Sequence, residues 1–220
     1  MIIRVVKVLI GVLLLPVSLA ASRMFAAELG KIQQFQGLAA YFLKGVVIYL
    51  VMHLILYKPN YFYVLGHELA HALATLICGG RVSSFHVSAK GGGVLTTKSN
   101  FFIALFPYFF PIYTILIWLV YFLVSLFKDI SAYAAHLILM IGFSITMHLV
   151  MTIETMKVKQ SDIFKTGYLF SVSLIYVLNI VLVSLILSVI FQDFSFAEFF
   201  RATSEQSAGY YHSIYEYLFL

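Results

Sequence analysis

Residues 166–191 read TGYLFSVSLIYVLNIVLVSLILSVIF, a run without a charged side chain. As an α-helix rising about 1.5 Å per residue, such a run exceeds the roughly 30 Å hydrocarbon core of a bilayer. The whole chain has the same character, because 62% of its 220 residues are hydrophobic and only 23 (14 basic and 9 acidic) are charged. A soluble globule needs more polar cover than this. The sequence therefore predicts a membrane protein.

Five further apolar segments accompany this run, at residues 2–21, 38–57, 60–78, 101–127 and 131–153. The first could pass for a signal peptide, but we expect a retained helix, followed by a polar connector at 22–37. We predict an all-α polytopic membrane protein with about six transmembrane or membrane-embedded helices, placed in the cell (inner or plasma) membrane. It should form one domain over residues 1–220, with a core at 38–191 and an interfacial tail at 192–220.

Residues 81–97 depart from the helical pattern. Short runs with β-branched and aromatic residues lie on both sides of a Lys-Gly-Gly-Gly stretch at residues 90–93. Alternation around a glycine-rich turn is typical of paired strands. We expect a small β-hairpin or sheet here.

The charge and the cysteine content limit the metal ligands and the binding partners that the chain can have. Cys78 is the one cysteine, so the chain has no internal disulfide and no Cys-based zinc cluster, and a metal would need His, Asp or Glu ligands. The net charge of +5 is spread between apolar runs rather than gathered on one face. This distribution fits juxtamembrane anchoring in the lipid bilayer and argues against nucleic-acid binding.

The segment GHELAHA at residues 66–72 carries a His-Glu-x-x-His pattern inside an apolar helix. Residues four apart share a helix face, so His67 and His71 can both bind one zinc ion. Zinc lowers the pKa of water, and Glu68 is placed to accept the proton as general base. Two core histidines and a buried acid could match the pattern by accident. Ionisable groups within a membrane helix usually have a functional partner, however, which favours a zinc hydrolase.

A catalytic zinc normally has three protein ligands, and the motif supplies two. Asp162 and Glu154 are the acids left once those in connectors and the tail are set aside. Asp162 lies on the same predicted side as the end of the 60–78 helix and is the preferred ligand, although Asp also commonly caps a helix there. His148 and His136 are expected to pack or hydrogen bond, and His148 is the better candidate for a contact behind the ligands.

Two prolines and two asparagines could each have either of two roles. Pro107 and Pro111 should kink the 101–127 segment, and the bend could also open a cavity. Asn100 and Asn179 could donate to a substrate carbonyl, but helix capping or hydrogen bonding between helices is the expected role.

The motif at residues 66–72, the Gly-Gly break at 79–80 and the Gly-Gly-Gly-Val strand at 91–94 together resemble the site-2 protease family of membrane-embedded zinc metalloproteases. The likeness is greatest to compact members without a PDZ domain. It implies an intramembrane endopeptidase that cleaves a membrane protein or peptide substrate, with one zinc ion held by His67, His71 and a distant aspartate that Asp162 matches best. Glu68 would be its general base.

In this context the glycine-rich hairpin has a possible role. A protease needs its substrate extended, and an exposed strand edge at Gly91, Gly92, Gly93 and Val94 could hold a substrate strand by main-chain pairing. Glycines would permit a close approach of the two backbones. A simple glycine-rich turn is the alternative.

One departure from the family pattern keeps another function open. The usual aspartate context, Leu-Asp-Gly with an upstream Asn and Pro, is absent, and Asp162 is followed by Ile163. A catalytically inactive membrane scaffold or regulator is therefore the alternative to the protease. A metal-dependent transporter is a third possibility, but the chain lacks the internal repeat that transporters often have.

Overall fold

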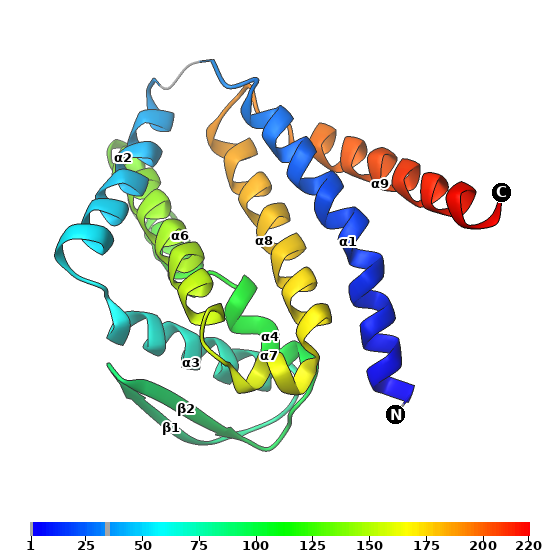
Figure 1. The fold of residues 1–220 in the computed structure, drawn as a ribbon. Coiled ribbons are helices and arrows are strands. Elements are labelled where there is room, and N and C mark those ends of the chain that lie inside the picture. The colour runs from blue at the N-terminus through cyan, green and yellow to red at the C-terminus, as the bar shows by residue number, and fades with distance from the viewer. Residues whose placement is uncertain (1, 34–35) are drawn as a thin grey trace. The chain divides into compact units, whose positions relative to one another are not determined.

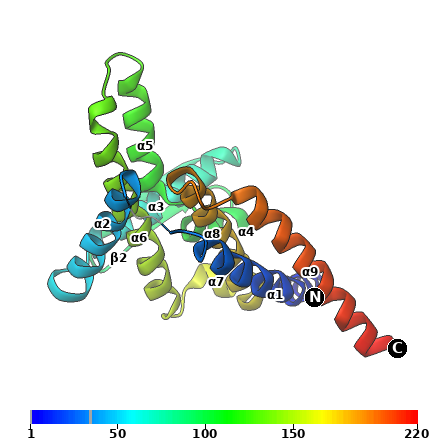
Figure 2. The same ribbon diagram turned by 90° about the horizontal axis from the view of Figure 1, so that it is seen from above.

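The structure is a computed structural model that describes residues 2–33 and 36–220, and the chain divides into two compact units. We call Gln36–Asp162 the central unit and Met1–Phe35 with Ile163–Leu220 the terminal unit. Figures 1 and 2 show their elements. That the whole chain makes one domain stays a prediction.

The central unit holds α2 (Leu38–Val51), a π-helical turn η1 (Met52–Leu56), α3 (Asn60–Ile77), β1 (Val82–Ser88), β2 (Gly91–Thr96), α4 (Phe101–Phe109), α5 (Ile112–Ser125), a 3-10 turn η2 (Ser131–Tyr133) and α6 (Ala134–Met156). The chain leaves it within the short helix α7 (Ser161–Thr166). The terminal unit holds α1 (Ile2–Leu29), α8 (Tyr168–Ile190) and α9 (Phe196–Phe219).

Four helical stretches among the described residues are long and apolar enough to cross a membrane: Ile2–Leu29, Leu38–Leu56, Ser131–Met156 and Tyr168–Ile190. The pair α4 and α5 would add a fifth span if it crosses as one bent segment. The mostly helical, multi-pass architecture predicted from sequence is thereby confirmed. The predicted segment 60–78 does form a helix, α3, but it is not one of these candidate spans.

The predicted span 101–127 is two helices, α4 and α5, that meet at an angle of 71°. Phe110 is extended at the break (φ −100°, ψ 105°), directly before Pro111. Proline has no N–H to continue the helix, and it disfavours the helical conformation of the residue before it. Pro107 lies inside α4 without ending it. Beyond the bend, α5 lies beside α6 (Figure 2).

Helices α2 and α6 lie side by side (Figure 1) at backbone contact. A Cβ added to Gly45 would sit 2.0 Å from the carbonyl oxygen of Leu139, and one added to Gly142 would sit 2.2 Å from that of Phe42. Real Cβ atoms do not approach so closely, so only glycine fits at either position. The two glycines thus set the distance between α2 and α6.

Helix α3 runs across the ends of α2 and α6, and the hairpin lies on its other side (Figure 1). Its small buried residues Ala70 and Ala74 pack against Ile103 and Phe106 of α4. Strands β1 and β2 pair antiparallel from Val82 with Thr96 to Ser88 with Gly91, which confirms the predicted hairpin. The helix that carries the His-Glu-x-x-His pattern is therefore held between the hairpin and the helices of this unit.

In the terminal unit, α1 packs against α8 and α9. The prediction of a polar connector from residue 22 onward is wrong, because α1 continues to Leu29. Residues 22–29 include several good helix formers, and the buried carboxylate of Glu28 is stabilised where the helix ends. It accepts hydrogen bonds from the Ser195 backbone N–H (3.1 Å) and from Lys31. The tail predicted at the membrane interface is mostly helical, as α9.

Candidate metal centre

Helix α3 brings the two motif histidines together. It begins directly after Pro59 and ends at Ile77. Gly79 follows with a φ of 69°, which suits glycine, and the Gly80 N–H donates to the Thr75 carbonyl at 2.8 Å. Between these ends the ring centroids of His67 and His71 are 4.8 Å apart. The spacing of four residues thus places both imidazoles on one face, as the sequence predicts.

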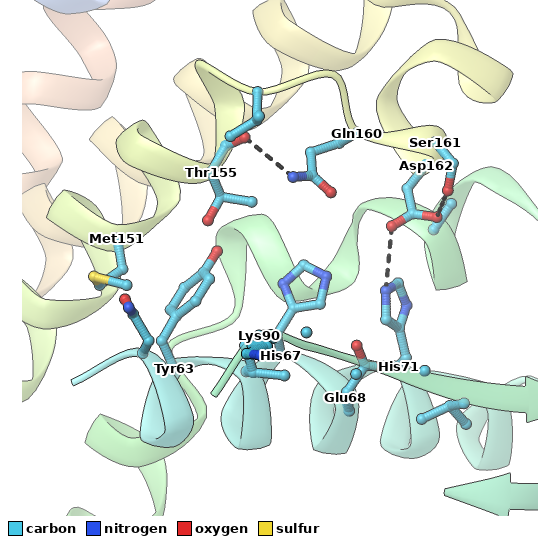
Figure 3. Close-up of a pocket in the computed structure, with 18 of the residues that line it drawn as sticks. Tyr63, His67, Glu68, His71, Lys90, Met151, Thr155, Gln160, Ser161 and Asp162 are labelled. Carbon is cyan, nitrogen blue, oxygen red and sulfur yellow. Dashed lines mark hydrogen bonds and ion pairs between the residues drawn. The ribbon is translucent and has the colours of Figure 1, made fainter. Parts of the chain in front are cut away.

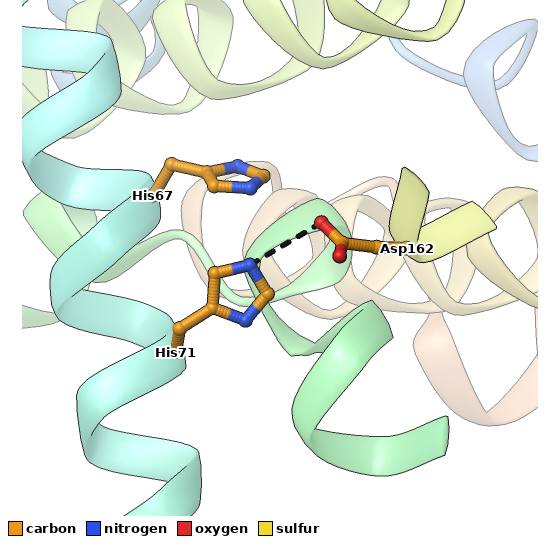
Figure 4. A group of neighbouring side chains, drawn as sticks. All are labelled: His67, His71 and Asp162. Atoms are coloured by element: carbon orange, nitrogen blue, oxygen red, sulfur yellow. Dashed lines mark ion pairs between the residues drawn. The ribbon is translucent and has the colours of Figure 1, made fainter. Parts of the chain in front are cut away.

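The His71 ring is held from both sides. Its Nδ1 is 2.9 Å from the carbonyl oxygen of Ile103. Because a carbonyl oxygen can only accept a hydrogen bond, Nδ1 must carry the proton and donate it. Its Nε2 lies 3.5 Å from Oδ2 of Asp162 (Figure 4). A neutral ring that donates from Nδ1 keeps its lone pair on Nε2, so Nε2 is the nitrogen available to a metal. Sequence reasoning did not find the Ile103 carbonyl, because a backbone oxygen leaves no signal in residue identity.

Asp162 lies in the first turn of α7, just after the connection from α6. Potential ligand atoms of His67, His71 and Asp162 all lie within 4.8 Å of one another. Figure 4 shows a nitrogen of each histidine turned toward the Asp162 carboxylate. The structure therefore brings together the three residues that the sequence selects as a ligand set.

The donor set fits a zinc ion. Neutral imidazoles and a carboxylate are ordinary zinc ligands, and three of them leave a fourth tetrahedral position open. Burial lowers the pKa of His67 to about 3, so its ring is neutral and can donate a lone pair. Burial would raise the pKa of Asp162, but the hydrogen bond and charge of His71 outweigh it and hold that pKa below its usual range. Asp162 is therefore ionised at neutral pH.

Glu68 and the three candidate ligands line one cavity of about 730 Å³ in the central unit. In Figure 3, Tyr63, His67, Glu68 and His71 reach it from α3, whereas Thr155, Gln160 and Asp162 reach it from α6 and the segment after it. Glu68 is 7% exposed, and burial raises the pKa of its carboxyl more than His71 lowers it. The cavity has room for a peptide segment beside a carboxylate and the group of three candidate ligands.

Strand β2 forms one wall of this cavity. Its lining includes Gly91, Gly92, Gly93, Val94 and the turn before them, but no residue of β1. A Cβ on Gly92 would lie 2.8 Å from Cγ of Glu68 and equally close to Val64 and to the His86 carbonyl oxygen. Glycine at this position lets the strand lie directly against the glutamate.

Glu154, the alternative third ligand, takes part in a different cluster. Its Oε1 is 2.6 Å from Nζ of Lys58 and 3.3 Å from Nε2 of His53, and His53 Nδ1 is 3.0 Å from the hydroxyl of Tyr49. Glu154 lines the cavity wall but is not part of the group formed by His67, His71 and Asp162. This cluster joins residues 49–58 to the distant Glu154 of α6, and no local spacing pointed to that contact.

The remaining polar candidates have local roles. Oδ1 of Asn100 accepts a hydrogen bond from the Ile103 N–H at 2.8 Å, so Asn100 caps α4. Nδ2 of Asn179 donates to the Ile175 carbonyl within α8 at 2.8 Å. Cys78 is half-buried and is not part of the candidate ligand group. Asn100 thus caps α4 while its Nδ2 also donates to Sγ of Cys78 at 3.6 Å, and Asn179 bonds within its own helix.

A family model described as peptidase M50B-like matches residues 38–151. The chain belongs to this family. Its membership confirms the resemblance to site-2 proteases, whose family members are zinc metalloproteases in general, and together with the candidate spans it makes the chain an integral membrane protein. No curated protein and no solved structure matches the chain.

The matched region of this M50B-like chain contains the whole His-Glu-x-x-His motif and the hairpin. It ends at residue 151, before Asp162, so the family match does not itself select the third ligand. The proximity of Asp162 to His71 is independent of the match.

Proposed function

We propose that the chain is an intramembrane zinc endopeptidase that hydrolyses peptide bonds of membrane-associated substrates. The observation that carries this proposal is the meeting of Asp162 with the motif histidines, because it adds a third ligand from a distant part of the sequence. The proposed site is His67, His71 and Asp162 around one zinc ion, with Glu68 as the general base. We also propose that it acts in the cell membrane.

A zinc ion bound by these residues would supply Lewis-acid polarisation of a water molecule and of the scissile carbonyl. Glu68 accepts a proton from the water as its oxygen bonds to the carbonyl carbon. Glu68 then returns this proton to the amide nitrogen as the C–N bond breaks. Ile103 holds the His71 ring in one orientation through its carbonyl throughout.

The substrate is proposed to enter as an extended strand along β2. A peptide bond within a helix is shielded and already hydrogen bonded, whereas a strand exposes its carbonyls. The place of Gly91, Gly92, Gly93 and Val94 on the cavity wall, close to Glu68, supports main-chain pairing there. The partner would be a membrane protein or peptide with a segment that can unwind.

The Glu68→Gln variant tests the chemistry. It keeps the size of the side chain but removes the base, so zinc content should stay at the parent level while cleavage of a co-expressed single-span substrate falls by at least about 10²-fold. Glu205→Gln is the matched control, because Glu205 is exposed on α9 and pairs with Arg201 at 2.8 Å. Full cleavage by the Glu68→Gln protein would rule out the proposed mechanism.

The alternative is an inactive membrane scaffold or regulator that retains the fold and the metal. The observation that favours it is Ile163 after Asp162, in place of the glycine of the usual family motif. Under this alternative, the Glu68→Gln protein would support the same cellular phenotype as the parent. Loss of the phenotype together with loss of cleavage supports the protease.

A further inference from the structure

A second, much smaller cavity lies behind His67. Its volume is about 20 Å³, the space of one water molecule. It is lined by α3, the α4–α5 bend and α6, with Gly66 and His67 on the first, Pro107 and Tyr113 near the bend, and Ser144 and His148 on the last. Most of the lining is apolar, but Tyr113, Ser144 and the two histidines are polar, and a cavity of this size with such partners can hold an ordered water.

His67 lines this cavity and carries a buried polar atom. Its Nδ1 is inaccessible to solvent and has no hydrogen-bond partner among the described residues. Figure 4 shows the other ring nitrogen turned toward His71 and Asp162. The two histidines of the motif therefore differ, because Nδ1 of His71 already donates to the Ile103 carbonyl.

A metal-bound histidine almost always donates its other ring N–H to a carboxylate, a carbonyl or a water. Such a bond fixes the tautomer and the orientation of the ring. His67 needs an acceptor for Nδ1–H, and the cavity beside it is too small for a side chain but large enough for a water. The geometry points to a water as that acceptor.

Two of the polar groups around the cavity already have hydrogen-bond partners in the protein. Ser144 Oγ lies 2.9 Å from Thr114 Oγ1 and 3.2 Å from the Ile141 carbonyl oxygen, and the Tyr113 hydroxyl donates to the Phe62 carbonyl at 2.5 Å. His148 is 8% exposed and lines the cavity. It can keep another partner on one nitrogen and still receive a hydrogen bond from the water on the other.

We propose that His148 is a positioning residue for the zinc ligand His67, acting through one buried water. The water accepts from His67 Nδ1–H and donates to a ring nitrogen of His148. This holds the His67 ring with its second nitrogen toward Asp162 and His71. The proposal rests on the proposed zinc site, and it adds to that site the group that sets the His67 tautomer.

The test measures zinc affinity by chelator competition on the purified full chain in a Glu68→Gln background, so that turnover plays no part. His148→Leu removes the hydrogen bond at similar volume and should raise the zinc Kd by about 10- to 100-fold. His148→Gln keeps an amide that can accept from the water and should recover most of that loss. A purely structural role for His148 would show no such rescue.

His136→Leu is the matched control, because His136 lies in the same helix but is exposed beside the Tyr133 ring. Its zinc Kd should equal that of the parent. A His148→Leu protein that binds zinc within about two-fold of the parent would overturn the positioning role while leaving the zinc site intact. A parent that binds no zinc would overturn the proposed function and, with it, this role.

A measurement on the unaltered protein covers the case in which His148→Leu does not fold. An experimental structure that resolves ordered water should place one within hydrogen-bond distance of both His67 Nδ1 and a nitrogen of His148. Direct contact of His67 Nδ1 with a protein group, or a dry cavity, would overturn the proposal.

Discussion

Replacing Gly92 with alanine should separate catalysis from metal binding. The added Cβ would lie 2.8 Å from Cγ of Glu68, from Cγ1 of Val64 and from the His86 carbonyl oxygen. Carbon atoms in ordinary contact are about 3.5–4.0 Å apart, so the methyl group is about 0.7–1.2 Å too close. Two of these neighbours belong to α3, and the third belongs to the strand paired with β2. Either the two side chains of α3 or the backbone of β2 must therefore shift by about 1 Å to admit the methyl group.

A displacement of this size strongly lowers the rate of a reaction that depends on a precise placement of the substrate. Misplacing a substrate by about 1 Å can cost about 10²-fold in rate, which corresponds to about 2.7 kcal/mol in the activation free energy. We expect Gly92→Ala to lower kcat/KM by about that factor on a single-span substrate in proteoliposomes. Zinc content should not change, because none of the proposed ligands lies on β2.

Gly93→Ala is the matched comparison. A Cβ on Gly93 would meet nothing within 4 Å, and neither Gly92 nor Gly93 has a positive φ that would strain an alanine. The factor by which kcat/KM falls in the Gly93→Ala protein should be at least ten times smaller than the factor in the Gly92→Ala protein. Equal losses in the two variants, or a fully active Gly92→Ala protein, would refute the close fit of β2 on Glu68 as a requirement for cleavage.

Three further predictions concern the ligand set and the packing. Asp162→Ala should leave the protein folded but lower its zinc content well below one ion per chain, and full occupancy in elemental analysis would remove Asp162 from the ligands. Gly142→Ala would place a Cβ 2.2 Å from the Phe42 carbonyl oxygen, so the free energy of unfolding should fall by about 1–3 kcal/mol and the Tm with it. Asn100→Ala removes the cap that accepts from Ile103 N–H, which should cost about 1 kcal/mol in denaturant titrations; an unchanged midpoint would contradict that role.

Local patterns were sufficient for much of the fold. Long apolar runs predicted the long helices, because a bilayer forces such a run to satisfy its backbone within a helix. The alternation around residues 90–93 predicted the hairpin. The four-residue spacing of His67 and His71 predicted their shared face, since helix geometry alone determines it.

Features that depend on distant contacts were harder to predict. Composition alone did not decide whether Asp162 or Glu154 is the third candidate ligand. The structure separates the two acids, because Glu154 contacts Lys58 and His53. Asp162 instead faces His71. The extension of α1 was missed because the polar residues 22–29 looked like a connector, whereas Glu28 is buried and hydrogen bonded. Such partners come from other parts of the chain, and no sequence spacing encodes them.

The central claim is that His67, His71 and Asp162 hold one zinc ion. Anomalous X-ray scattering at the zinc edge, from crystals of the purified protein, tests it most directly. The account predicts one peak about 2.0–2.2 Å from a nitrogen of each histidine and from a carboxylate oxygen of Asp162. A peak beside Glu154 and His53 instead, or no peak in zinc-replete crystals, would contradict it.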